Sequence, residues 1–361
     1  MRSGFSTSAC AAASAAAGLR VLLQSQPVGS ITIDLPTAPG VTFQLSRCEI
    51  TPGAVCCGVV KDAGDDPDVT HGLEIQAVVR QAAAAGIRLR GGKGVGKATL
   101  PGLPVPVGEA AINPGSHRLI LQVVQAELKR HAIPPEAGFE ITIQVPGGEQ
   151  IASQTMNPKL GIVGGISILG TDGLVRPYSA PAFRASLFYE LRVAFENGYT
   201  TIGLATGKRS SAYLRAALQD ARGLGVVDVG DELGYPIERA LKMGFQQIAI
   251  AGMIGKLSKL AQGRFQTHVE QGEIDFSFLA NLAAAQGTPA SLCDQIRTAR
   301  TAHQVQNWLK AAQLSIEPEI ARQAAAQVFQ RGAQRMHVAV FVFSLDGKLL
   351  GKASLEANHV D

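Results

Sequence analysis

Residues 200–210 read Thr-Thr-Ile-Gly-Leu-Ala-Thr-Gly-Lys-Arg-Ser, a short apolar run that ends in a glycine, two cations and a hydroxyl. Helical patterns flank this run over residues 183–197 and 211–222. Short apolar strands that alternate with helices are typical of parallel strands joined by crossover helices. The alternation continues through residues 226–229, 236–242 and 247–251. We therefore expect a Rossmann-like α/β domain with a parallel sheet in the second half of the chain.

A parallel sheet of this kind binds its ligand at the carboxyl ends of the strands. The expected site therefore lies at residues 205–210 and 252–256. Lys208 and Arg209 begin a helix, where cations are electrostatically unfavourable unless an anion lies nearby. They are either anion-binding residues or a solvated helix start, and the sequence leaves both open. Gly207, in the same strand-end turn, is an expected cofactor contact.

The rest of this half contains a helical segment and a last strand. Residues 290–331 are helical and polar on one face. Residues 338–343 form the final expected strand, which a turn at Asp346 and Gly347 closes.

The first half of the chain has a different pattern. An Ala-rich stretch over residues 8–23 predicts an amphipathic helix, and strands with a period of two follow it, separated by Pro and Gly. The clearest of these strands are residues 30–34, 41–45 and 140–145. Regular alternation of strands and helices is weak here, so we expect a two-layer α+β domain. The expected domains are residues 1–180 and 181–361.

The densest polar stretch is residues 61–72, Lys-Asp-Ala-Gly-Asp-Asp-Pro-Asp-Val-Thr-His-Gly. Its aspartates crowd one another unless they meet cations or share protons. Such repulsion can raise the pKa of a carboxyl group and make it a general base. A calcium loop or a solvated acidic turn is the alternative, although the bidentate Glu of an EF-hand is missing. The candidate catalytic residues are Asp65, Asp66 and His71, and the candidate substrate contacts are Lys61 and Asp68.

A glycine-rich run, Gly-Gly-Lys-Gly-Val-Gly-Lys, occupies residues 91–97. Its spacing nearly matches a phosphate-binding Walker loop, but Ala98 stands where that loop has Ser or Thr. Exposed N–H groups in such a run can hold carboxylates or phosphates, while a mobile hairpin would have the same pattern. We expect Lys93 and Lys97 to contact a substrate. The expected cofactor contacts in this run are Gly91, Gly92, Gly94 and Gly96.

Composition narrows the classes of function. Hydrophobic residues make up 46% and charged residues 17% of the 361-residue chain, which is typical of a globular protein. The net charge of +4 comes from cations spread along the chain, and this does not indicate a nucleic-acid-binding surface. No run is long and apolar enough to predict a membrane span. The five cysteines lack a disulfide or metal-ligand pattern, so we expect no metal site and a reducing, cytoplasmic compartment.

These segments, in this order, resemble the cobalt-precorrin-5B C1-methyltransferase family. The likeness covers most of the chain to about residue 280, and its most specific parts are the acidic segment and the Gly-Thr-Asp-Gly run at residues 170–173. One departure is Met253, where members of the family often have His. The other matching segments are residues 2–7 (Arg-Ser-Gly-Phe-Ser-Thr), 91–102, 108–114 (Gly-Glu-Ala-Ala-Ile-Asn-Pro), 157–177, 255–261 (Gly-Lys-Leu-Ser-Lys-Leu-Ala) and 267–268 (Thr-His).

The resemblance implies transfer of a methyl group from S-adenosylmethionine (SAM) to C1 of cobalt-precorrin-5B, giving cobalt-precorrin-6A, in cobalamin (vitamin B12) biosynthesis. The macrocycle carries many carboxylate arms, which suits cations as anchors. The expected partner is this small molecule, with no nucleic acid and no membrane, and a homodimer is one possible assembly. The further substrate contacts expected on this basis are Arg118, Thr171, Lys208, Arg209, Lys256 and His268.

Two other classes of function stay open on the sequence. A non-catalytic tetrapyrrole carrier or scaffold would hold the macrocycle without methylating it, and it would have no reason to bind S-adenosylhomocysteine. A nucleotide-dependent kinase or ligase would use the glycine-rich run, but the absence of Ser or Thr after Lys97 argues against it.

Overall fold

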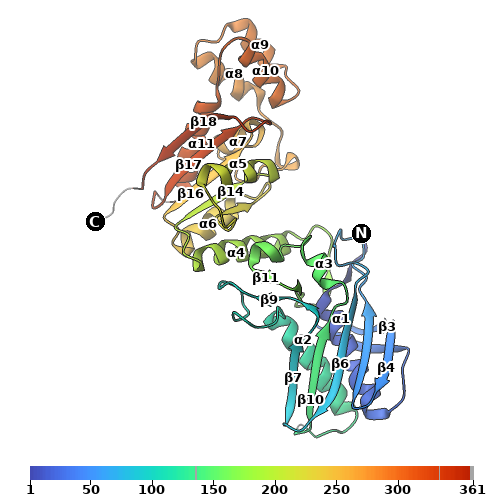
Figure 1. Ribbon diagram of the computed structural model, residues 1–361. Helices are drawn as coiled ribbons and strands as arrows, with labels where there is room; N and C mark the ends of the chain where they lie inside the picture. Colours follow the sequence, from blue (N-terminus) through green and yellow to red (C-terminus); the bar gives the residue numbers. More distant parts are fainter. Residues whose placement is uncertain (135, 333, 358–361) are drawn as a thin grey trace. The chain divides into compact units, whose positions relative to one another are not determined.

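The structure, a computed structural model, describes residues 1–134, 136–332 and 334–357. It is a mixed α/β structure, as the sequence predicts, and it divides into two compact units, Met1–Ala180 and the chain from Pro181 onward (Figure 1). Among the described residues, no helix is both long enough and apolar enough to cross a membrane.

The first unit is built on a five-stranded sheet with the order β4-β5-β6-β10-β7. All neighbours in it run antiparallel except β10 and β7, which are parallel. The predicted strand at residues 140–145 corresponds to β10. The strands are β4 (Arg47–Thr51), β5 (Ala54–Val60), β6 (Glu74–Ala82), β7 (Gly86–Gly91) and β10 (Gly138–Gln144).

A separate antiparallel hairpin joins β2 (Ser30–Leu35) to β3 (Ala38–Gln44). Both strands were expected from the period of two. Ile31, Ile33 and Leu35 are buried while the side chains between them are exposed, which is the pattern of a strand with one face on the core.

The Ala-rich helix α1 (Thr7–Gln24) is buried on nearly all sides, so the prediction that it is amphipathic is wrong. Its small side chains let it approach the sheet closely. A Cβ on Gly18 would lie 2.7 Å from a Val79 methyl, and Ser14 Oγ donates to the Ile75 carbonyl at 2.7 Å. On another side α1 packs against α2 (Pro114–Arg130), to which Arg20 binds through Glu127. The helix is therefore the centre of the first unit.

Short elements connect distant segments of this unit. The pairs are β1 with β13, β8 with β12 and β9 with β11. They place the N-terminal strand against residues 174–175 and the glycine-rich run against residues 162–166. Their bounds are β1 (Gly4–Phe5), β8 (Gly94–Val95), β9 (Lys97–Ala98), α3 (Gly148–Ala152), η1 (Asn157–Leu160), β11 (Ile162–Val163), β12 (Gly165–Ile166) and β13 (Leu174–Val175).

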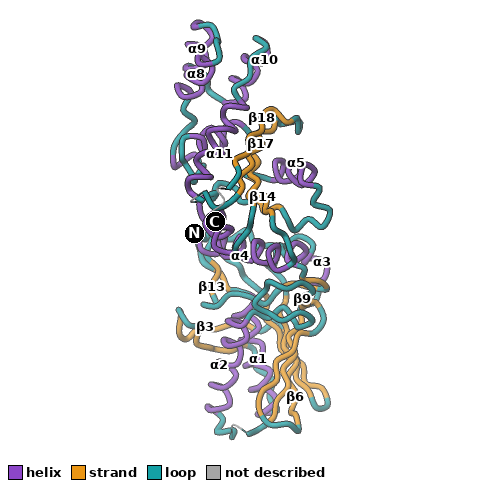
Figure 2. The backbone as a smooth tube through the Cα atoms, turned by 90° about the vertical axis from the view of Figure 1, so that its left-hand side faces the viewer, coloured by secondary structure: helices purple, strands orange, loops and turns teal. Residues whose placement is uncertain are grey.

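The second unit has a five-stranded sheet with the order β15-β14-β16-β17-β18. The first four strands of this order are parallel, and β18 is an antiparallel edge strand. Figure 2 shows the strands in orange between purple helices. The strands are β14 (Thr201–Ala205), β15 (Val226–Asp228), β16 (Gln247–Gly252), β17 (His337–Phe343) and β18 (Leu349–Leu355).

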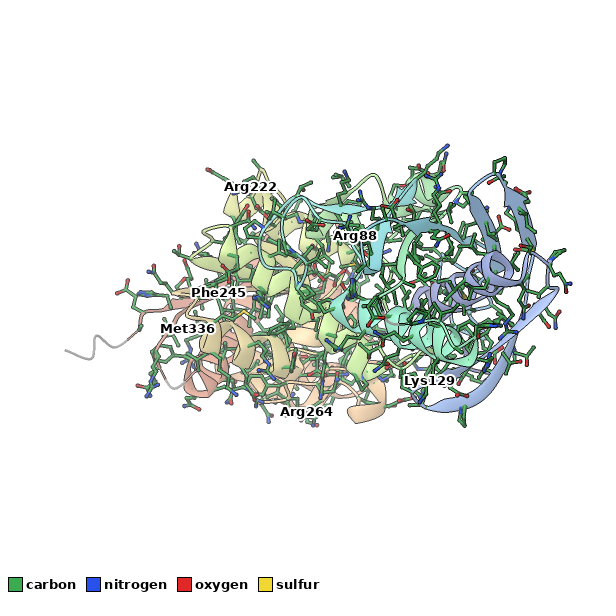
Figure 3. All side chains as sticks on the ribbon, turned by 90° about the horizontal axis from the view of Figure 1, so that it is seen from below. Arg88, Lys129, Arg222, Phe245, Arg264 and Met336 are labelled. Carbon is green, nitrogen blue, oxygen red and sulfur yellow. The ribbon has the colours of Figure 1, made fainter. Side chains whose placement is uncertain are left out.

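Helices cover both faces of this sheet. On one face α5 (Lys208–Leu218) packs over Ala205 and Ala249, and on the other face a larger core contains Ile202, Leu204 and Phe245. Figure 3 shows Phe245 within this unit and Arg222 at its surface. The helices that contribute to the larger core include α4 (Ala180–Glu196), α6 (Gly234–Met243), α7 (Ile254–Ala261) and α11 (Glu317–Arg331).

Two sequence predictions for this unit are wrong in detail. Residues 338–343 are not the final strand, because β18 follows them across the turn at Gly347, whose φ is +88°. The helical stretch at 290–331 is three helices, since Thr301 caps a new helix after α9. The elements before α11 are η2 (Val269–Gln271), α8 (Phe276–Ala285), α9 (Ala290–Arg297) and α10 (Ala302–Ala311).

A substitution at Gly94 tests the close packing around the glycine-rich run. Its φ is +75°, and a Cβ there would lie 1.8 Å from the Val145 carbonyl oxygen. We expect Gly94→Ala to lower the free energy of unfolding by about 3 kcal/mol or more, because backbone strain and a steric clash add. Gly108→Ala, at φ +90° with no atom near its Cβ, should cost only the strain, about 1 kcal/mol. Urea denaturation measures both, and equal losses would contradict the packing role of Gly94.

Candidate functional site

The acidic segment of the first unit folds around a buried ion pair. Lys61 is 1% exposed, and its Nζ donates to Asp68 Oδ2 at 2.7 Å. Asp68 Oδ1 accepts from the N–H and the hydroxyl of Thr70, at 2.8 and 2.6 Å. Partial burial disfavours the charge of Asp68, but these contacts outweigh it and hold the pKa of the carboxyl below its ordinary value. Lys61 and Asp68 therefore hold the segment in shape.

Arg2 binds two more aspartates of this segment, Asp62 and Asp65. Arg2 binds Asp62 through hydrogen bonds of 2.5 and 2.9 Å, and the Arg2 N–H donates to Asp65 at 2.5 Å. The Arg2 guanidinium, helped by the Gly64 N–H, lowers the pKa of Asp62 to about 2. The sequence left open whether the aspartates meet cations or repel one another. At Asp62 and Asp68 they meet cations, and the pKa of each of these two carboxyl groups is lowered.

In this segment the Asp66 carboxylate and the His71 Nε2 are available to a ligand. Among the described residues the Asp66 carboxylate has no hydrogen-bond or ion-pair partner. His71 is exposed, and its Nδ1 accepts a hydrogen bond from the Ala63 N–H at 3.1 Å. A neutral His71 ring therefore carries its proton on Nε2, where it can exchange a proton with a ligand.

Residues 167–173 lie at the beginnings of both long helices of the first unit. The Ser8 N–H at the start of α1 donates to the Leu169 carbonyl at 3.2 Å, and the Asn113 N–H before α2 donates to the Ile168 carbonyl at 3.0 Å. Thr171 is exposed and packs directly on Gly115, where a Cβ would lie 2.2 Å from its methyl group. The Gly-Thr-Asp-Gly run thus sits over two helix N-termini.

The glycine-rich run is part of short strands and is not an open loop. The N–H of Gly92 donates to the Ile143 carbonyl at 2.7 Å, and the N–H of Gly96 donates to the Ile166 carbonyl at 2.9 Å. A Cβ on Gly91 would lie 2.5 Å from that of Ala110. Close packing explains why these positions are glycine, and the N–H groups of Gly92 and Gly96 are already used.

The cations predicted in the first unit are exposed. In the part of the chain that the structure describes, the side chains of Lys93, Lys97 and Arg118 have no hydrogen-bond or ion-pair partner. They are therefore free to bind an anion, in contrast to Arg2 and Lys61.

The second unit has a cavity of about 830 Å³ at the carboxyl ends of its parallel strands. From β14 the chain continues to β15 on one side, while β16 lies on the other side of β14, so the strand order reverses beside the cavity. A parallel sheet opens a ligand crevice at such a reversal. The structure thus brings together the two strand-end segments that the sequence singled out. The predicted residues that line the cavity are Gly207, Lys208, Arg209, Lys256 and His268.

Lys256 connects the strand-end turns around this cavity. Its Nζ donates to the Thr206 carbonyl at 2.7 Å and to the Gly230 carbonyl at 3.3 Å, and it lies 3.0 Å from Asp231 Oδ1. These three acceptors use the three N–H groups of an ammonium. Lys256 therefore holds the turns in place and has no donor left for a substrate.

Asp231 continues this network. Its Oδ1 accepts from the Thr267 hydroxyl at 2.7 Å, and the Thr267 carbonyl accepts from the buried Lys259 ammonium at 2.9 Å. Partial burial opposes ionisation of Asp231, but the hydrogen bonds from Thr267 and Lys256 hold the pKa of its carboxyl below the ordinary value. His268, next to Thr267, is exposed at the cavity. The network fixes the cavity wall around the ion pair of Lys256 and Asp231.

Lys208 and Arg209 are at the first turn of α5 and line the same cavity. No acidic side chain among the described residues pairs with either. Because the positive end of a helix disfavours cations, these two are electrostatically unsatisfied without an anion. Gly207 before them is extended, and no atom lies within 4 Å of the Cβ position. Met253, the departure from the family pattern, also lines the cavity, at the end of β16.

Sequence reasoning missed several residues of this wall, among them Asp231, Phe276 and Arg300. Asp231 follows β15, so the rule that sites lie at strand ends could have found it. Phe276 begins α8, and Arg300 lies in the turn between α9 and α10. They carry no local signal, because they reach the cavity only through the tertiary packing of these helices.

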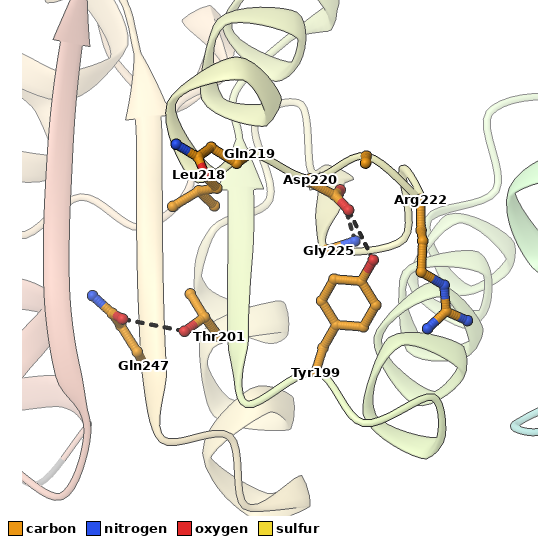
Figure 4. Close-up of a pocket in the computed structure, with 9 residues that line it drawn as sticks. Tyr199, Thr201, Leu218, Gln219, Asp220, Arg222, Gly225 and Gln247 are labelled. Atoms are coloured by element: carbon orange, nitrogen blue, oxygen red, sulfur yellow. Dashed lines mark hydrogen bonds between the residues drawn. The ribbon is translucent and has the colours of Figure 1, made fainter.

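A second hollow, of about 390 Å³, lies at the amino ends of β14 and β16 (Figure 4). The Asp220 carboxylate joins two other residues that line it, Tyr199 and Gly225. One oxygen of Asp220 accepts from the Tyr199 hydroxyl at 2.8 Å and the other from the Gly225 N–H at 2.9 Å. Since these contacts are made within the chain, they stabilise the loop before β15. Arg222, the cation of this hollow, donates to the Asn197 carbonyl at 3.5 Å and to the Asn197 side-chain oxygen at 3.3 Å.

The chain is similar to known proteins along nearly its whole length. Residues 1–177 match the sequence model of the CbiD family, and residues 266–354 match that of the CbiD C-terminal domain. A cobalt-precorrin-5B C(1)-methyltransferase from Geobacillus kaustophilus is 39% identical over 98% of this chain and 95% of its own. One from Leptospira interrogans is 38% identical over 98% of this chain and 95% of its own.

Among solved structures, the cobalamin biosynthesis protein CbiD from Archaeoglobus fulgidus is 26% identical. The comparison covers 80% of this chain and 85% of that one, with a TM-score of 0.39.

The ion pair of Lys61 and Asp68 is testable by removing one charge at a time. We expect Asp68→Asn to lower the free energy of unfolding by about 3 kcal/mol, because it leaves a buried ammonium without its counter-charge. Lys61→Met should cost less, since water can reach Asp68, whose side chain is 24% exposed. Chemical denaturation near pH 7 measures both, and a larger loss in Lys61→Met would contradict the argument.

The same pair predicts a pH dependence. The pKa of Asp68 is below its ordinary 3.8, so its contribution to stability is complete above that value and is lost as the pH falls through the lower folded pKa. The stability difference between the wild type and Asp68→Asn should therefore shrink only in that acidic range.

Proposed function

The chain belongs to the CbiD family, and from this membership we propose that it is a cobalt-precorrin-5B C(1)-methyltransferase of cobalamin biosynthesis. The observation that carries the proposal is the identity of 38–39% to proteins of that name over 98% of the chain, which includes both units. The cavity of the second unit supports it, because unpaired cations suit a macrocycle with carboxylate arms.

We propose S-adenosylmethionine as the methyl donor. Transfer of a methyl group from a sulfonium to a ring carbon needs the carbon nucleophile, the methyl group and the sulfur in line, so the protein contributes mainly by positioning. The turn at Gly207 supports a place for the donor at the carboxyl edge of the second unit, since its backbone is open to a ligand. The Gly91 to Gly96 positions are weaker candidates, because their packing within the chain already explains them.

Carboxylate arms of the substrate would bind to Lys208 and Arg209, with His268 beside them. Both cations lack acidic partners among the described residues, so a bound carboxylate would relieve their repulsion with the α5 N-terminus. In the first unit Lys93, Lys97 and Arg118 are available for the same chemistry, and Thr171 is exposed above the start of α2.

Proton transfer on the ring would fall to Asp66 and His71. The Asp66 carboxylate and the His71 Nε2 are free to meet a ligand, whereas Asp65 already accepts from the Arg2 N–H. We propose that Asp65 positions this segment and that Asp66 or His71 moves the proton.

We also propose a cytoplasmic location. The five cysteines are free thiols, and burial raises the pKa of Cys10 to about 12, which keeps it unreactive. Free thiols of this kind are usual in a reducing compartment.

The first experiment is binding and turnover with the intact protein. We expect calorimetric binding of S-adenosylhomocysteine and none of ATP with magnesium, and methyl transfer from labelled SAM to cobalt-precorrin-5B. Transfer of the label to C1 supports the proposed function. Binding of the macrocycle without transfer would indicate a carrier and overturn the proposed function.

Asp66→Asn tests the proton-transfer role. We expect the rate of methyl transfer to fall at least about 100-fold, because general acid–base groups contribute about that much, while S-adenosylhomocysteine binding and the melting temperature stay the same. Asp34→Asn is the control, since Asp34 is an exposed carboxylate on the hairpin of the same unit, and Asn keeps the oxygen that accepts from the Gly40 N–H. If Asp66→Asn turns over like this control, Asp66 has no catalytic role.

A further inference from the structure

The helices α8, α9 and α10 form an insertion between α7 and α11 of the second unit. In Figure 1 and Figure 2 they stand together beyond the sheet. Their apolar side chains, such as Leu279, Ile296 and Val305, join the larger core of this unit. The insertion is therefore a fixed part of the unit.

The insertion packs on the cavity at one defined point. A Cβ on Gly255, at the start of α7, would lie 3.3 Å from an Ile274 methyl and 3.6 Å from the Cβ of Ala302. Ile274 precedes α8 and Ala302 begins α10, so the start of the insertion and the start of its last helix lie against α7 beside the cavity. Phe276 and Arg300 from the same segments line the cavity.

A capping arrangement fixes the backbone of Arg300. Thr301 Oγ1 accepts from the Gln304 N–H at 3.1 Å, and Gln304 Oε1 accepts from the Arg300 N–H at 3.1 Å. In a capping box the second bond goes to the N–H of the N-cap residue. Here it goes to the N–H of Arg300, one residue before the N-cap Thr301. Arg300 is thus held immediately before a helix start, with its side chain at the cavity wall.

The cavity wall has more positive than negative charge. Its cations are Lys208, Arg209, Lys256, Lys259 and Arg300, and its carboxylates are Asp231 and Glu273. Lys256 and Asp231 neutralise each other, and Lys259 is buried on the Thr267 carbonyl. Arg300, like Lys208 and Arg209, has no acidic partner among the residues that the structure describes. Outside that ion pair the wall keeps four cations, Lys208, Arg209, Arg300 and the buried Lys259, against one carboxylate, Glu273, so an anion would lower the repulsion among the cations.

We propose that Arg300 binds a peripheral carboxylate of the macrocyclic substrate, so that the α8–α10 insertion recognises the substrate and not the methyl donor. A planar guanidinium matches a carboxylate through two parallel hydrogen bonds, which a lysine at the same place cannot make. Lys208 and Arg209 come from α5, on another side of the cavity, so carboxylate arms on different parts of the ring would be held from two elements. The assignment rests on the proposed function for the identity of the macrocycle.

The test compares Arg300→Ala and Arg300→Lys with Arg297→Ala in the intact protein. Arg297 is the matched control, because it is an exposed arginine of the same insertion, bound to Asp294 at 2.8 Å and outside the cavity wall. We expect Arg300→Ala to raise the KM for cobalt-precorrin-5B about 10-fold to 100-fold, Arg300→Lys to lie between it and the wild type, and Arg297→Ala to match the wild type. Binding of S-adenosylhomocysteine should be the same in all four proteins.

A KM for Arg300→Ala within about twofold of the control would overturn the assignment, and so would an equal loss of S-adenosylhomocysteine binding. A wild type without methyl transfer would instead count against the proposed function. In that case fluorescence titration with uroporphyrin, an octacarboxylic porphyrin, decides the role of Arg300. Weaker uroporphyrin binding in Arg300→Ala than in Arg297→Ala supports a carboxylate site at Arg300. Equal binding in the two variants would contradict that site.

Discussion

The ammonium group of Lys256 is the contact on which the carboxyl edge of the second unit depends. It joins the turn after β14, the turn after β15 and the helix after β16, through the Thr206 and Gly230 carbonyls and the Asp231 carboxylate. Backbone carbonyls at strand ends are left without sheet partners, so a single cation that satisfies two of them and one carboxylate fixes the turns relative to one another. The cavity keeps its shape because these turns cannot move independently.

Pairing decides which cations of this protein can meet a ligand. Arg2 and Lys61 hold the acidic segment through Asp62 and Asp68, and Lys256 is used by the chain in the same way. Lys208, Arg209 and Arg300 remain without acidic partners among the described residues. An uncompensated cation at a cavity wall costs free energy in the empty protein, which a bound carboxylate recovers. Ion pairing within the chain therefore separates the cations that hold the structure from those that are free for a ligand.

The glycines divide in a similar manner. Gly94 and Gly96 are needed because other backbone segments approach them closely. Gly94 begins β8, and Gly96 lies between β8 and β9. Gly207 has open space at its Cβ position. A run of several glycines thus marks close packing in the first unit, and a single glycine at a strand end marks the open edge of the second.

The sequence by itself determined the mixed α/β class, the strands of the hairpin and of the parallel sheet, and the segments at 205–210 and 252–256 that surround the cavity. These follow from side-chain periodicity and from turns, which are local properties of the chain. Only the tertiary structure decided that α1 is buried on nearly all sides, that β18 follows β17, that Lys61 and Lys256 form ion pairs, and that Arg300 reaches the cavity. The physical reason is that burial, ion pairing and cavity walls depend on residues far apart in sequence, and no local pattern records which of them meet.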